Sequence, residues 1–389
     1  MLKRSFMILC IHIFCVLFMG CGKIKPEFKV MESGYESQKE ELDENNTDMP
    51  EKTDSSEIVK VEETKPMSVA QAFSSVLLNE TEMFCTIREQ GEYTEVIKSN
   101  EGYGLLKEMP YAERKEVIYF AVVDLDGDMI SEVVVELENY DYIVLRYRKG
   151  QIRGMSVSNK EMDLFKKNGL FRQISGCDAG RIGKLHYIGD VMVFDEALRM
   201  ADQYTFYLYD IISDEKTWRE INNFYYESPD VEWHDYTEKA VHEWIIENPL
   251  FTEISVETTK NSNIRQEYLD SLSYLIDITY DYWLKNDEEY RKAAVAYYEG
   301  CQKEMNKIYE LCQEKLSEEE LEELQNEQQD WQENFDLRLE KELSRYEIED
   351  MEDLLEIDDR SAYFRYGEIT LRRTLRLVDL FYGFGNYVI

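Results

Sequence analysis

The spacing of apolar residues divides the chain beyond residue 67 into two parts. The stretch SVAQAFSSVLLNE has apolar residues at helical spacing, and Ser68 stands where an N-cap is expected. Six β-branched and aromatic runs follow, separated by Gly, Asp and Asn: VIYFAVVD, EVVVEL, YIVLRYR, QIRGMSV, KLHYIGDVMVF and YTFYLYDII. Such runs are typical of strands. We therefore predict a mainly antiparallel β-rich domain with a few helices over residues 68–262.

The second part, residues 263–389, has a helical pattern with no proline and four glycines. Two apolar seams alternate spacings of three and four residues: Tyr298, Cys301, Met305, Ile308, Cys312 and Leu316, then Leu321, Leu324, Gln328, Trp331 and Phe335. Between the seams, Ser317 and Glu320 fit a capping box. The pattern predicts an antiparallel helical hairpin in an all-α domain. The expected fold class is thus α+β, a β-rich domain followed by an all-α domain.

The N-terminus has the order of a signal peptide. Lys3 and Arg4 precede an apolar run that ends at Gly20-Cys21, and the run is shorter than the ~20 residues of a spanning helix. The segment LFMGC resembles the lipobox of bacterial lipoproteins, which implies removal of residues 1–20 and lipidation of Cys21. Anchoring by an uncleaved N-terminus is the alternative. Residues 21–67, rich in charged residues, Ser and Thr, are expected to form a disordered acidic tether on the outer face of the cytoplasmic membrane.

The charge balance restricts the partners. With 44 basic and 81 acidic side chains the net charge is −37, which disfavours nucleic acid and anionic lipid headgroups. An acidic protein attracts cationic ones, although acidic composition also serves solubility. The segment 347–359 has eight acidic and no basic residues. It is either a contact surface or a solvated helix or loop face.

An aspartate-rich segment, DLDGDMISE, lies between two strand-like runs and is expected to connect a hairpin. Oxygen ligands for Ca²⁺ fall at positions 1, 3, 5, 7 and 9: Asp124, Asp126, Asp128, the carbonyl of Ile130, and Glu132. An EF-hand is excluded, because Met129 and Val135 replace its glycine and its last glutamate.

The segment resembles the shorter calcium loops of FG-GAP-like repeats, in which the position of Met129 is a glycine. A left-handed backbone at Met129 would cost about 1–2 kcal/mol. The alternative is an Asp-rich turn in which the carboxylates cap their own backbone. Ca²⁺ is the one cofactor that the sequence suggests.

The helical part carries a second resemblance. Glu304-Met305-Asn306 and the later Arg-Thr-x-x-Leu at 373–377 resemble motifs of the LprI-type lysozyme-inhibitor domain, over about residues 286–382. The matching positions are Asn306, Tyr309, Gln328, Trp331, Asp336, Arg373 and Thr374. Phe335 and Leu339 stand where the family usually has arginine and cysteine, so its usual disulfide is expected to be absent or rewired. The resemblance implies a surface protein that binds and blocks a cationic lysozyme.

Catalytic motifs are absent from the sequence. His242-Glu243 lacks the second histidine of a zinc helix, and there is no nucleophile elbow, P-loop or dinucleotide fingerprint. A triad assembled from distant residues stays open. We expect no enzyme, but a cell-surface lipoprotein with a protein-binding, lysozyme-inhibitor-like domain. The alternative is a calcium-stabilised envelope scaffold or adhesin without inhibitor activity.

Overall fold

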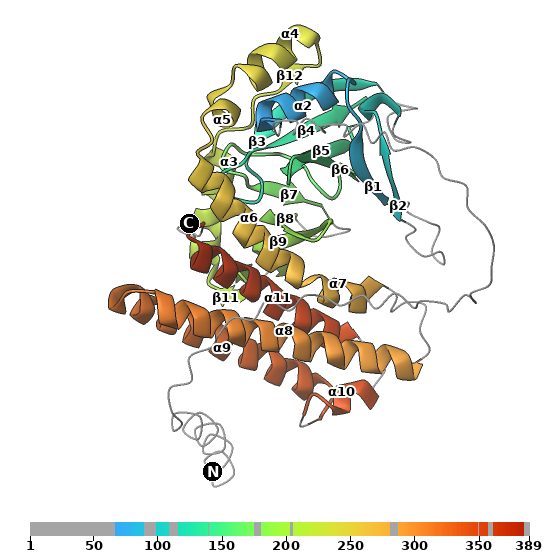
Figure 1. Ribbon diagram of the computed structural model, residues 1–389. Helices are drawn as coiled ribbons and strands as arrows, with labels where there is room; N and C mark the ends of the chain where they lie inside the picture. The colour runs from blue at the N-terminus through green and yellow to red at the C-terminus, as the bar shows by residue number, and fades with distance from the viewer. Residues whose placement is uncertain are drawn as a thin grey trace, which may run out of the picture. The chain divides into compact units, whose positions relative to one another are not determined.

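The computed structural model describes most of the chain beyond the expected tether: residues 67–88, 99–108, 116–138, 140–174, 180–202, 205–280, 287–348, 350–356 and 361–384. These residues belong to one compact unit. The expectations for residues 1–66, Cys21 included, lie outside the described residues. A β-rich region is followed by an all-helical region, which confirms the predicted α+β class (Figure 1).

The first sheet has seven strands in the order β12-β3-β4-β5-β6-β1-β2. Its neighbours are antiparallel except for the parallel pair β1 and β6. The strands are β1 (Met83–Arg88), β2 (Ser99–Gly104), β3 (Val117–Val123), β4 (Glu132–Leu137), β5 (Tyr142–Arg148), β6 (Gln151–Val157) and β12 (His234–Asp235).

Both faces of this sheet are buried, which explains the unbroken valine run of β4. Val133 and Val135 face a core shared with the helix α2 (Val69–Leu77), the π-helix η3 (His242–Ile246) and α5 (Pro249–Thr252). Val134 faces the second sheet instead, in a core with Leu185 and Tyr187. Ser68 caps α2, as predicted. The short helices η1 (Leu106–Glu108) and α4 (Glu238–Val241) complete this region.

The second sheet is a five-stranded antiparallel meander in the order β11-β10-β9-β8-β7. Helix α3 (Glu215–Glu227) packs on β9 and β10, around the buried Tyr225. The strands are β7 (Phe171–Gln173), β8 (Arg181–Ile188), β9 (Val191–Asp202), β10 (Thr205–Leu208) and β11 (Ile211–Ser213).

The helical region has the predicted hairpin. Ser317 and Glu320 form the capping box at the start of α9, and buried residues of both seams share one hydrophobic core. The helices are α6 (Val256–Ser271), α7 (Ser273–Tyr280), α8 (Asp287–Lys315), α9 (Glu318–Arg345), α10 (Asp353–Glu356) and α11 (Ser361–Tyr382). The predicted domain boundary between residues 262 and 263 falls inside α6. None of the described helices is both long and apolar enough to cross a membrane.

Helix α11 positions the rest of the helical region. It packs along α8, where Gly367 allows close approach: a Cβ atom on Gly367 would lie 2.6 Å from the ring of Tyr297. It also contacts α6 and β9, and α6 in turn contacts β8 (Figure 1). Helix α11 therefore links the core of the hairpin to the second sheet.

Candidate functional site

The aspartate-rich segment is the connection between β3 and β4, as predicted, and its backbone is held by its own carboxylates. Asp124 accepts hydrogen bonds from the backbone N–H groups of Gly127 at 2.8 Å and Met129 at 3.0 Å. Asp126 accepts one from the N–H of Asp128, and Asp128 accepts one from Ile130. These bonds fit the Asp-rich turn, and they also bring the carboxylates together.

Met129 has a left-handed backbone with φ 67°, as does Gly127 with φ 74°. Methionine at this position is disfavoured by about 1–2 kcal/mol, because its Cβ crowds the following carbonyl. The side chain is 55% exposed, so packing does not offset the cost. The hydrogen bonds to Asp124 therefore hold this strained residue in place.

The carboxylates converge on a space of atomic size. One oxygen from each of Asp124, Asp126 and Asp128 lies within 4.8 Å of the others. An adjacent cavity of about 20 Å³ is lined by Asp126, Asp128, Ile130 and Glu132, which is room for a water molecule or an ion. The structure thus brings three of the predicted carboxylates together, Asp124, Asp126 and Asp128. The other two predicted residues, Ile130 and Glu132, line the adjacent cavity, which Arg146 and Arg148 also line.

Burial and mutual repulsion raise the pKa values of several carboxyl groups at this site. Burial and the charge of Asp126 raise the pKa of Asp124 to about 6. Burial and the neighbouring carboxylates raise the pKa values of Asp128 and Glu132 well above their usual range. An oxygen-only set of crowded carboxylates suits a hard divalent cation, so these residues fit Ca²⁺. Asp124, Asp126, Asp128, Glu132 and the Ile130 carbonyl would hold it, and the ion would neutralise their repulsion.

A buried arginine, Arg265 of α6, ties this loop to the helical region. Its Nη2 donates to the carbonyl of Asp126 at 3.0 Å, and its Nη1 lies 3.3 Å from the Asp126 carboxylate. Its Nε donates to Asp379 of α11 at 2.7 Å. Burial opposes the charge of Arg265, but Asp379 and Asp126 raise its pKa above the usual value.

The other carboxylate oxygen of Asp379 lies 2.9 Å from Nε2 of the buried His186 on β8. Burial disfavours the Asp379 charge, yet Arg265 and His186 hold the pKa of this carboxyl well below its usual range. Ser262 of α6 donates a further hydrogen bond to Asp128. These contacts are not predictable from the sequence, because nothing near Arg265 in the chain indicates its partners.

The positions that resemble the lysozyme-inhibitor motif are mostly internal. The Nε of Arg373 donates to Gln328 at 2.9 Å, and Arg373 also pairs with Glu327. Thr374 donates to the carbonyl of Thr370 at 2.9 Å, Trp331 is buried, and Tyr309 packs on the same core. Asn306 and Asp336 are exposed and lie outside this group. The motif therefore joins α9 to α11.

The cysteines of α8 are buried thiols. Cys301 and Cys312 are not in a disulfide. Burial raises the pKa of Cys301 to about 12 and that of Cys312 to about 11, so neither is a reactive thiolate near neutral pH. Cys177 lies outside the described residues.

The outward face of α9 is acidic. No lysine or arginine occurs between Leu316 and Leu337, and exposed positions there hold nine carboxylates: Glu318, Glu319, Glu320, Glu322, Glu323, Glu327, Asp330, Glu333 and Asp336. We call these residues the α9 acidic face. The acidic segment 347–359 is described only at 347–348 and 350–356, where Leu354 of α10 is buried in the helical core.

No family model, curated protein or solved structure matches the chain.

Proposed function

We propose that this is a non-catalytic binding protein whose α9 acidic face captures a cationic protein, a lysozyme being the first candidate. The observation that carries the proposal is the set of nine exposed carboxylates on α9, in a stretch of the helix without lysine or arginine. One of the nine, Glu327, pairs with Arg373 of α11. Lipidation of Cys21 after export belongs to the same proposal, since it would hold this face where envelope proteins and lysozymes meet the cell.

Electrostatic attraction gives this face its effect. A protein of net charge −37 with carboxylates concentrated on one helix steers a cationic protein toward that helix, and salt weakens the steering. The opposite side of α9 holds the helix in position, because Trp331 and Phe335 pack in the helical core. Arg373 of α11 also pairs with Glu327. The motif positions thus support the face, and the exposed carboxylates meet the partner.

The test uses the full chain and hen lysozyme, with binding kinetics and protection of cell walls from lysis measured at low and high salt. We expect stoichiometric protection at low salt and weaker protection at high salt. Changing Glu319, Glu322, Glu323 and Glu333 to Gln should slow association about tenfold or more at low salt. The matched control changes four exposed glutamates elsewhere, Glu232, Glu243, Glu247 and Glu253, to Gln with the same change in net charge.

Equal slowing in both variants would show a general charge effect and overturn the α9 assignment. Absence of binding at large excess of the folded full chain would reject capture of that lysozyme.

A second candidate function is a calcium-stabilised envelope scaffold, favoured by the carboxylates and the 20 Å³ space of the β3–β4 loop. Ca²⁺ should raise the melting temperature, since a ligand at 100 times its Kd stabilises the folded state by about 2.7 kcal/mol. Asp128→Asn should abolish this rise, whereas Asp330→Asn on α9 should not. Ca²⁺-dependent self-association or sedimentation with cell walls would favour the scaffold, and an unchanged melting temperature would reject the Ca²⁺ site.

A further inference from the structure

The hairpin between β10 and β11 has a strained turn that is hydrogen-bonded to three arginines. Its two turn residues, Tyr209 and Asp210, both have left-handed backbones, with φ 46° and 67°. A two-residue hairpin with this backbone normally holds Asn, Asp or Gly, so Tyr209 is the unusual residue here. Here Arg372 of α11 forms two hydrogen bonds to the Asp210 carboxylate, at 2.9 and 2.7 Å. Arg376 donates to the carbonyl of Tyr209 at 3.0 Å, and Arg338 of α9 donates to that of Asp210 at 2.6 Å.

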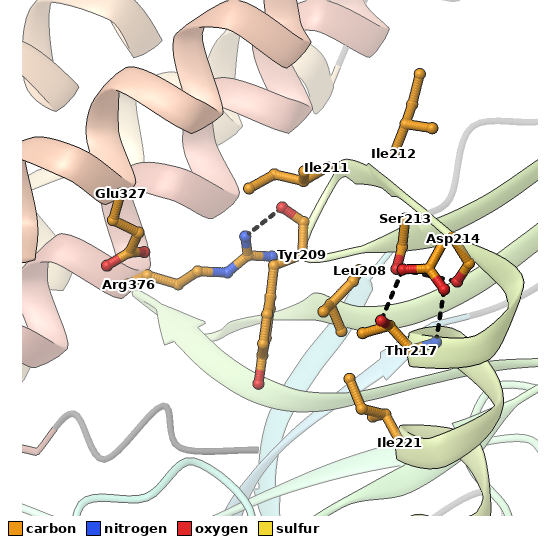
Figure 2. A pocket seen from close by; sticks show the side chains of 10 residues that line it. All are labelled: Leu208, Tyr209, Ile211, Ile212, Ser213, Asp214, Thr217, Ile221, Glu327 and Arg376. Atoms are coloured by element: carbon orange, nitrogen blue, oxygen red, sulfur yellow. Dashed lines mark hydrogen bonds between the residues drawn. The ribbon is translucent and has the colours of Figure 1, made fainter.

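A cavity of about 440 Å³ opens beside this turn, between the start of α3 and the helices α9 and α11 (Figure 2). Its apolar wall comes from two different cores: Ile211 packs with the helical core, whereas Leu208 and Ile221 pack with Tyr225 under α3. Ile212 adds to this wall. The volume falls within the range of small-ligand sites, which are common where two structural regions meet.

The polar groups of the cavity mostly have their donors occupied. Arg376 directs its Nε and Nη2 to Asp195, its Nη1 to the carbonyl of Tyr209, and Nη2 also to the carbonyl of Glu196. The hydroxyls of Ser213 and Thr217 donate to Asp214. These groups offer an incoming ligand little beyond acceptor oxygens.

The carboxylates at the rim provide such acceptors. Glu327 pairs with Arg373 through Oε1, and its side chain is 58% exposed. Asp214 is exposed and caps α3. The charge of Arg376 is offset by Asp195 at 2.5 Å. An apolar wall with an acidic rim is complementary to a cation on an apolar stem.

We infer that this cavity binds a primary ammonium or guanidinium group carried on an apolar stem, with the stem against Ile211, Ile212 and Ile221 and the charge at Glu327. Two sources have this chemistry: a free alkylamine, or a lysine or arginine side chain of a bound protein. The second source rests on the proposed function, because Glu327 is also part of the α9 acidic face.

The test follows the isoleucine methyl resonances of the full chain during titration with n-hexylammonium, n-hexanol or n-hexanoate. Hexylammonium should shift the methyls of Ile211, Ile212 and Ile221 saturably, and hexanoate should bind at least tenfold more weakly. Glu327→Gln should weaken hexylammonium binding roughly tenfold, as expected for loss of a charged acceptor. Ile212→Trp, which fills the cavity, should abolish binding with the remaining spectrum retained. Glu340→Gln, the same change at an exposed position of α9, should have no effect.

Absence of saturable shifts, equal binding of hexanoate, or an unchanged affinity in Glu327→Gln would each overturn the inference. Lysozyme distinguishes the two sources. If Ile212→Trp speeds its dissociation at unchanged salt dependence, the cavity takes a side chain of the partner; if dissociation is unchanged, the free amine is the ligand. If lysozyme does not bind the wild-type chain, the proposed function fails, and the hexylammonium titration still decides the cavity.

Discussion

Two buried ionic clusters join α11 to the β-rich region, and their charge balance differs. The turn cluster lies at the β10–β11 hairpin and consists of Asp195, Asp210, Arg372 and Arg376. The loop cluster lies at the β3–β4 loop and consists of Asp124, Asp126, Asp128, Glu132, Arg265, Asp379 and His186. The first pairs its two carboxylates with two guanidinium groups, and a third, that of Arg338, lies 3.9 Å from Asp210. The second has five carboxylates with one arginine and one histidine in direct contact, and Arg146 and Arg148 line the adjacent cavity.

The pKa values of the buried carboxyl groups therefore shift in opposite directions in the two clusters. In the turn cluster, burial opposes ionisation of Asp210, but Arg372, Arg376 and Arg338 more than compensate and lower its pKa to about 2. In the loop cluster, burial and the charge of Asp126 raise the pKa of Asp124 to about 6. The turn cluster is internally neutralised and fixes α11 on the sheet. The loop cluster has an excess of negative charge that a cation would neutralise.

The largest effect is expected on breaking the neutral cluster. Arg376→Leu leaves Asp195 buried without its cation, which should lower the free energy of unfolding by about 3–5 kcal/mol in urea titrations. Added Ca²⁺ should not restore the loss. The double variant Asp195→Leu/Arg376→Leu should recover much of it, since apolar pairs often replace buried ion pairs without loss. A single-variant loss below about 1 kcal/mol would contradict the assigned role of Arg376.

Arg265→Leu makes the corresponding change in the loop cluster, and its outcome should depend on Ca²⁺. Without the ion the loss should again be about 3–5 kcal/mol, because Asp379 and the loop carboxylates lose their shared cation. Ca²⁺ at 100 times its Kd for the variant should stabilise the variant by about 2.7 kcal/mol. The same Ca²⁺ concentration should stabilise the wild-type chain less, because Arg265 already neutralises part of the charge there, so the loss should shrink. Parallel urea titrations with and without Ca²⁺ measure the difference. Equal losses in both conditions would show that Arg265 and Ca²⁺ do not neutralise the same carboxylates.

Acid should weaken the turn cluster in a defined range of pH. The folded pKa of Asp210, about 2, lies below the ordinary value near 3.9, so its ionisation stabilises the fold above about pH 4. This contribution, about 2–3 kcal/mol, should be lost as the pH falls from about 4 to 2. Asp210→Asn should remove it at neutral pH and flatten that part of the stability profile. Wild-type and variant profiles of identical slope between pH 4 and 2 would contradict the prediction.

The sequence predicted features that depend on neighbours in the chain. The capping box of Ser317 and Glu320 spans four residues, and the loop carboxylates from Asp124 to Glu132 span nine, so spacing alone indicated both features. The clusters depend instead on distant partners. Arg265 is 139 residues from Asp126 and 114 from Asp379, and His186 is 193 residues from Asp379. No local pattern marks such an arginine as buried.

The same long-range contacts explain why the chain does not divide at the predicted boundary between residues 262 and 263. A change from strand-like to helical pattern at this point suggested separate domains, but α6 crosses it and provides Arg265 to both sides. Arg372 and Arg376 of α11 likewise reach Asp210 and Asp195 on the second sheet. Periodicity shows where helices begin, and it does not show which polar residues on them are paired across regions.

The smallest effect is expected at Met129, the strained residue of the loop cluster. Met129→Gly should raise the free energy of unfolding by up to about 1 kcal/mol, because glycine adopts φ 67° without Cβ crowding and loses part of that gain to chain entropy. Its side chain is 55% exposed, so little packing is lost. Tyr140→Gly, at another exposed residue with φ 66°, is the matched control and should give a similar gain. Ca²⁺ affinity distinguishes the two variants. Met129→Gly relieves strain in the aspartate-rich loop itself, so this variant should bind Ca²⁺ more tightly than the wild-type chain in calorimetric titration, whereas Tyr140→Gly should not. Equal Ca²⁺ affinity of the two variants would mean that the strain at Met129 does not limit Ca²⁺ binding.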